Sequence, residues 1–151
     1  MRPVALLGSI ALGLALGSLV VGHALMVPLV RDAPLLDPNL ARTLAAPLVQ
    51  RSSELLLACA IVIAMVSRRW RLLRLAGPTA LLVAGLAAVD RFFLLPRLGK
   101  AWSRVDLVAQ RPIDRLEAAH QLQSTHEGVL AVALLLLLVL FGLVNLPART
   151  R

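Results

Sequence analysis

Four long apolar runs, separated by shorter polar segments, dominate the chain of 151 residues. A membrane-spanning helix needs about 20 mostly apolar residues. The pattern predicts four such spans, at residues 4–30, 48–67, 75–96 and 127–146. We therefore expect an all-α integral membrane protein, in which residues 1–151 form one four-helix bundle.

The first run, residues 4–30, carries no formal charge. A secretory signal peptide has an apolar core of only about 7–15 residues, so this run is expected to be a retained helix. Amphipathic lead-in segments precede the second and fourth spans. Arg42, Gln50 and Arg51 interrupt the apolar pattern before the second span, and a polar stretch at residues 113–127 follows Pro112 before the fourth. Proline suits the first turn of a helix.

Composition excludes two classes of protein. Hydrophobic residues make up 59% of the chain and the mean hydropathy is +0.83. Soluble domains use roughly 45–50% apolar residues, and disordered chains use fewer. A soluble globule and a disordered chain are therefore both excluded. The single cysteine, Cys59, rules out an intrachain disulfide and a multi-cysteine zinc site.

The net charge of +8 is interpreted as a topology signal. Four spans place both termini on one side of the membrane, together with seven basic residues and no acid: Arg2, Arg68, Arg69, Arg71, Arg74, Arg149 and Arg151. The other side holds more bases in number, but they are spread over long segments, which influence orientation less. We expect a multi-pass protein of the cell (inner) membrane with cytoplasmic termini, in contact with the lipid bilayer and not with nucleic acid.

With this orientation, the polar residues near the spans fall in the outer half of the membrane. The candidates for an outward-facing pocket are His23, Arg51, Glu54, Asp90, His120 and His126. Ionisable groups at this depth are costly and usually face the bundle interior or a water-filled cavity. We expect Asp90 to contact a His or Arg of another helix, and Arg91 to extend toward the headgroups. The alternative is that several of these residues only lie at the ends of helices and form no pocket.

Such a pocket could bind or pass a small solute, a cation or protons. A metal would need His23 with His126 or His120, and Met26 as a soft ligand. A bis-His haem would use the same helices. Residue spacing fixes neither, and no cofactor is expected.

Catalytic chemistry has little support in the sequence. The chain has no Walker motif, no GxSxG and no HExxH. Cys59 lies among apolar residues, where a buried thiol is inert. The pairs Ser52–Ser53 and Ser124–Thr125 are interpreted as helix-start residues, and Asp37 as a turn and cap residue. We expect no enzymatic activity.

Small residues recur at intervals of four on two spans. They are Ser9, Gly13 and Gly17 on the first, and Ala80, Ala84 and Ala88 on the third. Small residues let membrane helices approach closely. Packing within the bundle is the favoured interpretation. The alternative is a face for a second copy or another membrane protein, which would make the chain a structural or interaction subunit.

Four short segments carry a resemblance to a known family. They are His23-Ala-Leu-Met-Val-Pro28, Leu48-Val-Gln-Arg-Ser52, Asp90-Arg-Phe-Phe-Leu-Leu-Pro96 and His120-Gln-Leu-Gln-Ser-Thr-His126. This layout resembles the small four-span membrane proteins related to transmembrane protein 205, whose bacterial members form a domain of unknown function. The resemblance implies an integral membrane protein without an assigned reaction. It also implies a His followed closely by Ser near the last helix, for which His120 and Ser124, or the pair with His126, are the candidates. Copper-resistance D membrane proteins are a more distant likeness, carried by outer-side His and Met.

Overall fold

The computed structural model describes residues 3–67, 76–110 and 112–145. Its helices are α1 (Pro3–Gly17), the π-helical segment η1 (Ser18–Met26), α2 (Val27–Arg31), α3 (Pro38–Ser67), α4 (Ala76–Val89), the π-helical segment η2 (Asp90–Leu94), α5 (Leu95–Trp102) and α6 (Ile113–Asn145). Within these residues, four helical stretches are long and apolar enough to cross a membrane. The predicted all-α four-helix bundle is confirmed, and the chain is a multi-pass membrane protein.

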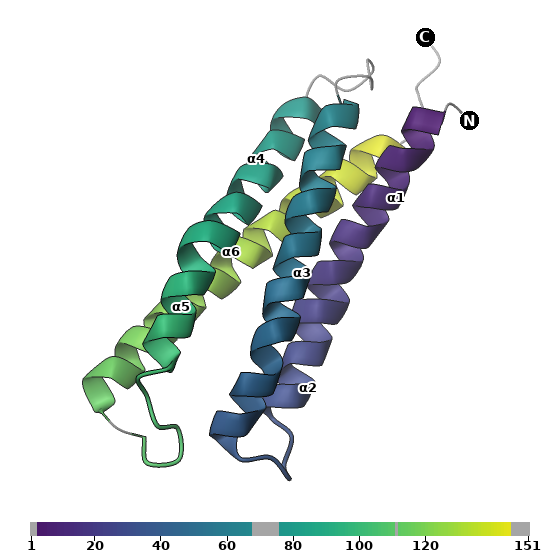
Figure 1. Cartoon of the computed structure of the whole chain (residues 1–151). Coiled ribbons are helices and arrows are strands. Elements are labelled where there is room, and N and C mark those ends of the chain that lie inside the picture. The colour runs from purple at the N-terminus through teal and green to yellow at the C-terminus, as the bar shows by residue number, and fades with distance from the viewer. Residues whose placement is uncertain (1–2, 68–75, 111, 146–151) are drawn as a thin grey trace.

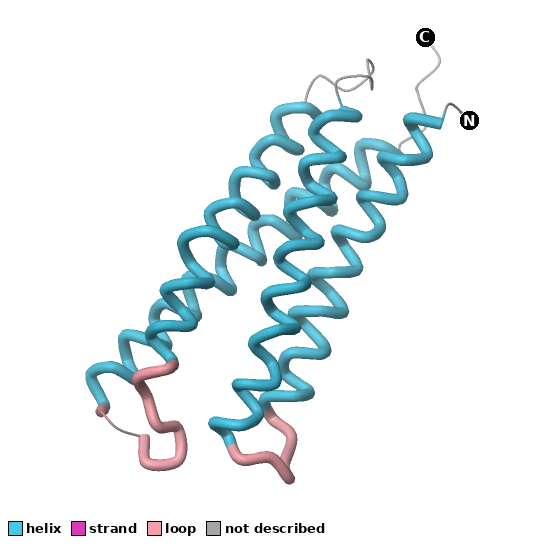
Figure 2. The backbone as a smooth tube through the Cα atoms, viewed as in Figure 1, coloured by secondary structure: helices cyan, strands magenta, loops and turns pink. Residues whose placement is uncertain are grey.

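The four spans run up and down the bundle (Figure 1). The start of α1, the end of α3, the start of α4 and the end of α6 lie together, and we call this the termini end. The loops at residues 32–37 and 103–110 lie at the opposite end, which we call the loop end (Figure 2). Helix α3 packs against α1 and α4, and α6 packs against α4, α5 and α1. Each span therefore has neighbours on two sides.

The spans extend beyond the predicted bounds at the loop end. Both amphipathic lead-ins belong to the long helices α3 and α6, and the third span continues past Pro96 to Trp102. Asp37 caps α3, since its Oδ1 accepts hydrogen bonds from the backbone N–H of Asn39 at 2.9 Å and of Leu40 at 3.2 Å. The predicted span ends at residues 75 and 146 lie outside the described residues, as do the seven basic residues on which the orientation rests.

The predicted proline exits do not end their helices. Pro28 and Pro96 each stand in the first turn of an α-helix that follows a π-helical segment. Proline lacks the N–H that would complete a helical hydrogen bond. Local π-helical winding is one way in which membrane helices accommodate that loss. His23 and Asp90 both lie in these π-helical segments.

Apolar side chains fill the half of the bundle toward the termini end. The fully buried large residues there include Leu12, Leu56, Ile63, Leu137 and Leu140, with alanines between them. A smaller cluster at the loop end consists of Trp102, Val105 and Ala119. Small residues between the large ones allow the close helix packing that stabilises bundles in lipid.

The small-residue stripe of the first span does not face the bundle as predicted. Ser9 and Gly13 are exposed and Gly17 is half-buried, whereas Leu12 and Ala15 are buried. A Cβ added at Gly13 or Gly17 would meet no atom within 4 Å. The reason is that leucine and small residues alternate here, so small residues occur on more than one face of the helix. On α4, Ala80 is buried while Ala84 and Ala88 are half-buried.

Candidate functional site

A fully buried carboxylate joins three of the four spans. Asp90 in η2 has no exposed surface. Its Oδ2 accepts a hydrogen bond from Ser53 Oγ of α3 at 2.8 Å, and its Oδ1 lies 2.5 Å from Nδ1 of His126 in α6. The His126 tautomer that fits this contact carries its proton on Nδ1 and donates it to Asp90. The predicted contact between Asp90 and a His of another helix is confirmed.

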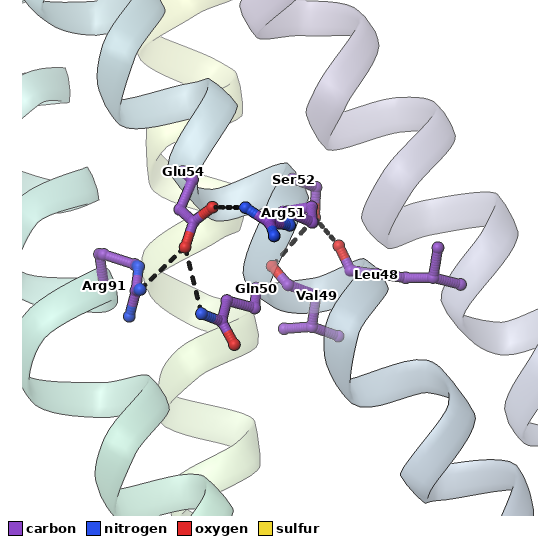
Figure 3. Close-up of polar contacts among 7 residues, drawn as sticks. All are labelled: Leu48, Val49, Gln50, Arg51, Ser52, Glu54 and Arg91. Atoms are coloured by element: carbon purple, nitrogen blue, oxygen red, sulfur yellow. Dashed lines mark hydrogen bonds and ion pairs between the residues drawn. The ribbon is translucent and has the colours of Figure 1, made fainter.

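The first span reaches the same level of the bundle through His23 in η1. Its Nε2 lies 2.9 Å from Ser52 Oγ. The Ser52 hydroxyl is directed to backbone carbonyl groups of its own helix, at 2.8 Å from Leu48 O and 3.1 Å from Val49 O (Figure 3). Because that hydroxyl has a single proton, its oxygen accepts the Nε2–H of His23. The His23 and His126 rings then meet edge to face, with centroids 5.7 Å apart.

We call these five residues, His23, Ser52, Ser53, Asp90 and His126, the polar layer. The close approach of the first two spans at this level depends on Gly22. A Cβ added at Gly22 would lie 2.8 Å from Ser52 Cβ, which is a clash. The absent side chain therefore lets η1 approach α3 near enough for His23 to reach Ser52.

A second ionic group lies beside the polar layer, around Glu54 (Figure 3). Its Oε1 accepts hydrogen bonds from Arg91 Nη2 at 2.9 Å and Gln50 Nε2 at 3.1 Å. Its Oε2 accepts one from Arg51 Nη1 at 3.0 Å. Arg51 was a pocket candidate and an arginine of another helix that could have contacted Asp90, and Arg91 was expected to extend toward the headgroups. Both instead bond to Glu54, because a carboxylate within reach is a better partner for arginine than solvent or a distant headgroup.

A cavity of about 700 Å³ lies between the polar layer and the Trp102 cluster. All four spans and the 103–110 loop contribute to its walls. Its apolar lining includes Val27, Val49, Leu95, Leu98 and Leu130, and its polar lining includes His23, Arg31, Arg42, Arg91, Gln123, His126 and Glu127. The cavity therefore has apolar walls with a few polar groups facing into it.

The loop end of the cavity is formed around Arg42 and Trp102. The guanidinium carbon of Arg42 lies 3.0 Å from the centroid of the Trp102 ring. Sequence reasoning identified neither residue as part of a site. His120, which was a pocket candidate, is exposed and contacts the Trp102 ring edge to face at 5.1 Å between centroids. The structure therefore separates His120 from the polar layer.

Among the described residues, no group of three or more His, Cys, Asp or Glu side chains could hold a metal ion. The two histidines suggested as ligands, His23 and His126, lie 5.7 Å apart between ring centroids, and each already has a ring nitrogen in a hydrogen bond. Met26, the suggested soft ligand, is 46% exposed.

The serine pairs were assigned wrongly to helix starts. Ser52 and Ser53 lie in the middle of α3, and Ser124 and Thr125 lie inside α6. A signal for Ser52 and Ser53 was present in the sequence. They continue the helical spacing of Ala45, Leu56 and Ile63, all of which are buried. Serine on the buried stripe of a membrane helix indicates a hydrogen bond to a neighbouring helix.

The chain matches no protein-family model, and no curated protein and no solved structure matches it.

Proposed function

We propose that this membrane protein binds a small solute in the cavity between its four spans. The observation that carries the proposal is the cavity itself, at about 700 Å³. Ligand pockets typically measure about 300–1,000 Å³, with mostly apolar walls and a few polar groups that orient the ligand. The lining described above has this composition.

The charges of the cavity favour a solute over a bare cation. Three arginines line it, Arg31, Arg42 and Arg91, against a single carboxylate, Glu127. The buried carboxylate of Asp90 already accepts hydrogen bonds at both oxygens. A cation would therefore meet a net positive lining and no free buried carboxylate among the residues that the structure describes.

The packing favours binding over passage. Toward the termini end, the described part of the bundle is filled by fully buried Leu12, Leu56, Ile63, Leu137 and Leu140. A polar solute would lose its hydration there without gaining hydrogen bonds. The cavity is thus better suited to hold a solute than to conduct it.

Orientation and family are part of the same proposal. The concentration of arginines near the termini supports cytoplasmic termini in the cell (inner) membrane. The cavity lies toward the loop end and would then face the outside. The four-span layout supports a relation to the transmembrane protein 205 family, and the proposed function is non-enzymatic.

The test uses the full chain in lipid nanodiscs and a neutral fluorescent probe, N-phenyl-1-naphthylamine. Val49 lines the cavity on α3, so Val49→Trp should fill part of it and abolish saturable probe binding. Ala58 is an exposed residue of the same helix, and Ala58→Trp should leave binding unchanged. Circular dichroism and gel filtration check that both variants fold. Equal binding by Val49→Trp and wild type, or no saturable binding to wild type, would overturn the proposal.

The second candidate function, an interaction subunit, draws on the outward placement of Gly13 on α1. Small exposed residues on a membrane helix permit close contact with another helix. Chemical crosslinking in membranes tests this candidate. Gly13→Leu should lower the yield of crosslinked oligomer or complex, and an unchanged yield would count against it.

A further inference from the structure

We propose that Arg42 is an anion-binding residue of the cavity, and that the bound solute carries a carboxylate or phosphate-type group on an apolar body. The inference rests on the proposed function and names the chemical class of its ligand. It starts from the hydrogen-bonding state of one guanidinium group.

Arg42 is half-buried on α3 and leaves most of its donors unused. Its Nη1 is buried and has no hydrogen-bond partner. Its Nη2 makes a long contact of 3.4 Å to Gln123 Oε1. A guanidinium has five N–H donors, and a buried charge without partners is costly. An anion at this position would supply the missing acceptors, and a carboxylate or phosphate can accept two parallel bonds from the guanidinium fork.

The acids near Arg42 do not neutralise it. None of the ion pairs within the described residues includes Arg42. Glu127 also lines the cavity, but its Oε1 accepts a hydrogen bond from Gln123 Nε2 at 2.8 Å. Asp32 lies 3.2 Å from Nε of Arg31. Of the three arginines that line the cavity, Arg42 is therefore the one for which the described residues supply no ion-pair partner.

Trp102 fixes the position of this charge. Its ring is buried and lies against the guanidinium at 3.0 Å from ring centroid to guanidinium carbon. A cation over an aromatic face is held electrostatically and keeps its N–H edges free for other acceptors. Leu95, Leu98 and Val27 belong to the apolar lining of the same cavity. The lining therefore suits a ligand whose anionic group binds Arg42 and whose apolar body contacts these apolar side chains.

The test compares two probes with the same naphthylamine skeleton. N-phenyl-1-naphthylamine is neutral, and 1-anilinonaphthalene-8-sulfonate carries one sulfonate. With the full chain in nanodiscs of neutral lipid, we expect the anionic probe to bind at least tenfold more tightly. Arg42→Gln should abolish this preference and leave binding of the neutral probe unchanged. Arg51, whose side chain is 82% exposed, provides the control Arg51→Gln, which should keep the preference.

The outcomes separate this inference from the proposed function. Saturable binding of both probes with equal affinity, or a preference that survives Arg42→Gln, would overturn the anion site while leaving the solute cavity standing. Saturable binding of neither probe would overturn both. A lipid headgroup and a soluble organic acid share the required chemistry. Displacement of the anionic probe by dihexanoyl phosphatidic acid alone would indicate the lipid as the source, and displacement by 1-naphthoate would indicate the acid.

Discussion

His126 of α6 and Asp90 of η2 meet at 2.5 Å between Nδ1 and Oδ1, although 36 residues separate them in the chain. The other oxygen of Asp90 accepts the Ser53 hydroxyl of α3. One carboxylate thus joins three helices at a depth where it has no exposed surface. This contact lies at the edge of the cavity, which His126 also lines.

Asp90→Ala should destabilise the bundle strongly. The substitution leaves the Ser53 hydroxyl and the His126 Nδ1–H without their acceptor in a buried site. Removing one member of a buried pair costs about 3–5 kcal/mol. The free energy of unfolding in mixed detergent micelles measures the loss. Glu117→Ala, at an exposed position of α6, is the control and should change stability by less than about 0.5 kcal/mol. Similar small losses in both variants would show that Asp90 does not join the helices.

Gly22→Ala should disturb the contact between the first and second spans. The new Cβ would lie 2.8 Å from Ser52 Cβ, so η1 and α3 must move apart and the bond from His23 to Ser52 must lengthen. Overpacking of this kind typically costs about 1–3 kcal/mol. Gly13→Ala makes the same chemical change where no atom lies within 4 Å. Thermal unfolding of the two variants side by side is the measurement, and a lower stability of Gly13→Ala would refute the assigned packing.

Arg91→Met should lower the melting temperature more than Arg51→Met. Both arginines bond to Glu54, but Arg91 connects two spans whereas Arg51 lies on the same helix as Glu54. The Arg91 side chain is 24% exposed and that of Arg51 is 82% exposed. Solvent screens the exposed pair, which contributes little. Melting of the detergent-solubilised variants, followed by circular dichroism, checks the order, and the reverse order would contradict it.

Acid should reduce the stabilisation that Asp106 provides in the loop between α5 and α6. Asp106, outside the spans, accepts hydrogen bonds from Asn39 Nδ2 and from the N–H groups of Ala109 and Val108, and these lower its pKa below the ordinary 3.8. A carboxylate with a depressed folded-state pKa contributes stability above its unfolded pKa and loses it as the pH falls through the folded-state value. The melting temperature of wild type should therefore exceed that of Asp106→Asn at about pH 7, and this difference should be smaller at about pH 2.5. An equal difference in melting temperature at both pH values would contradict the stabilising role of the Asp106 carboxylate.

Apolar run length was enough to predict the fold, because each span needs a long stretch of apolar residues whatever its neighbours are. The contact of Asp90 with a histidine followed from the cost of a buried carboxylate. The choice of partner for Arg91 did not follow, since it depends on Glu54, 37 residues away, reaching the same level of the bundle. The site at Arg42 and Trp102 was missed because a short amphipathic lead-in gives no sign that its polar residues line a cavity.

The π-helical winding of η1 has a consequence for chain length. Successive residues of an α-helix turn by about 100°, so deleting one residue from η1 would rotate α1 against α2 by about that angle. Leu12 and Ala15, now buried, would turn away from the bundle, or His23 would leave Ser52. A substitution of one apolar residue for another leaves the rotation of α1 relative to α2 unchanged. Insertions and deletions inside residues 18–26 should therefore be selected against more strongly than changes of one apolar residue for another.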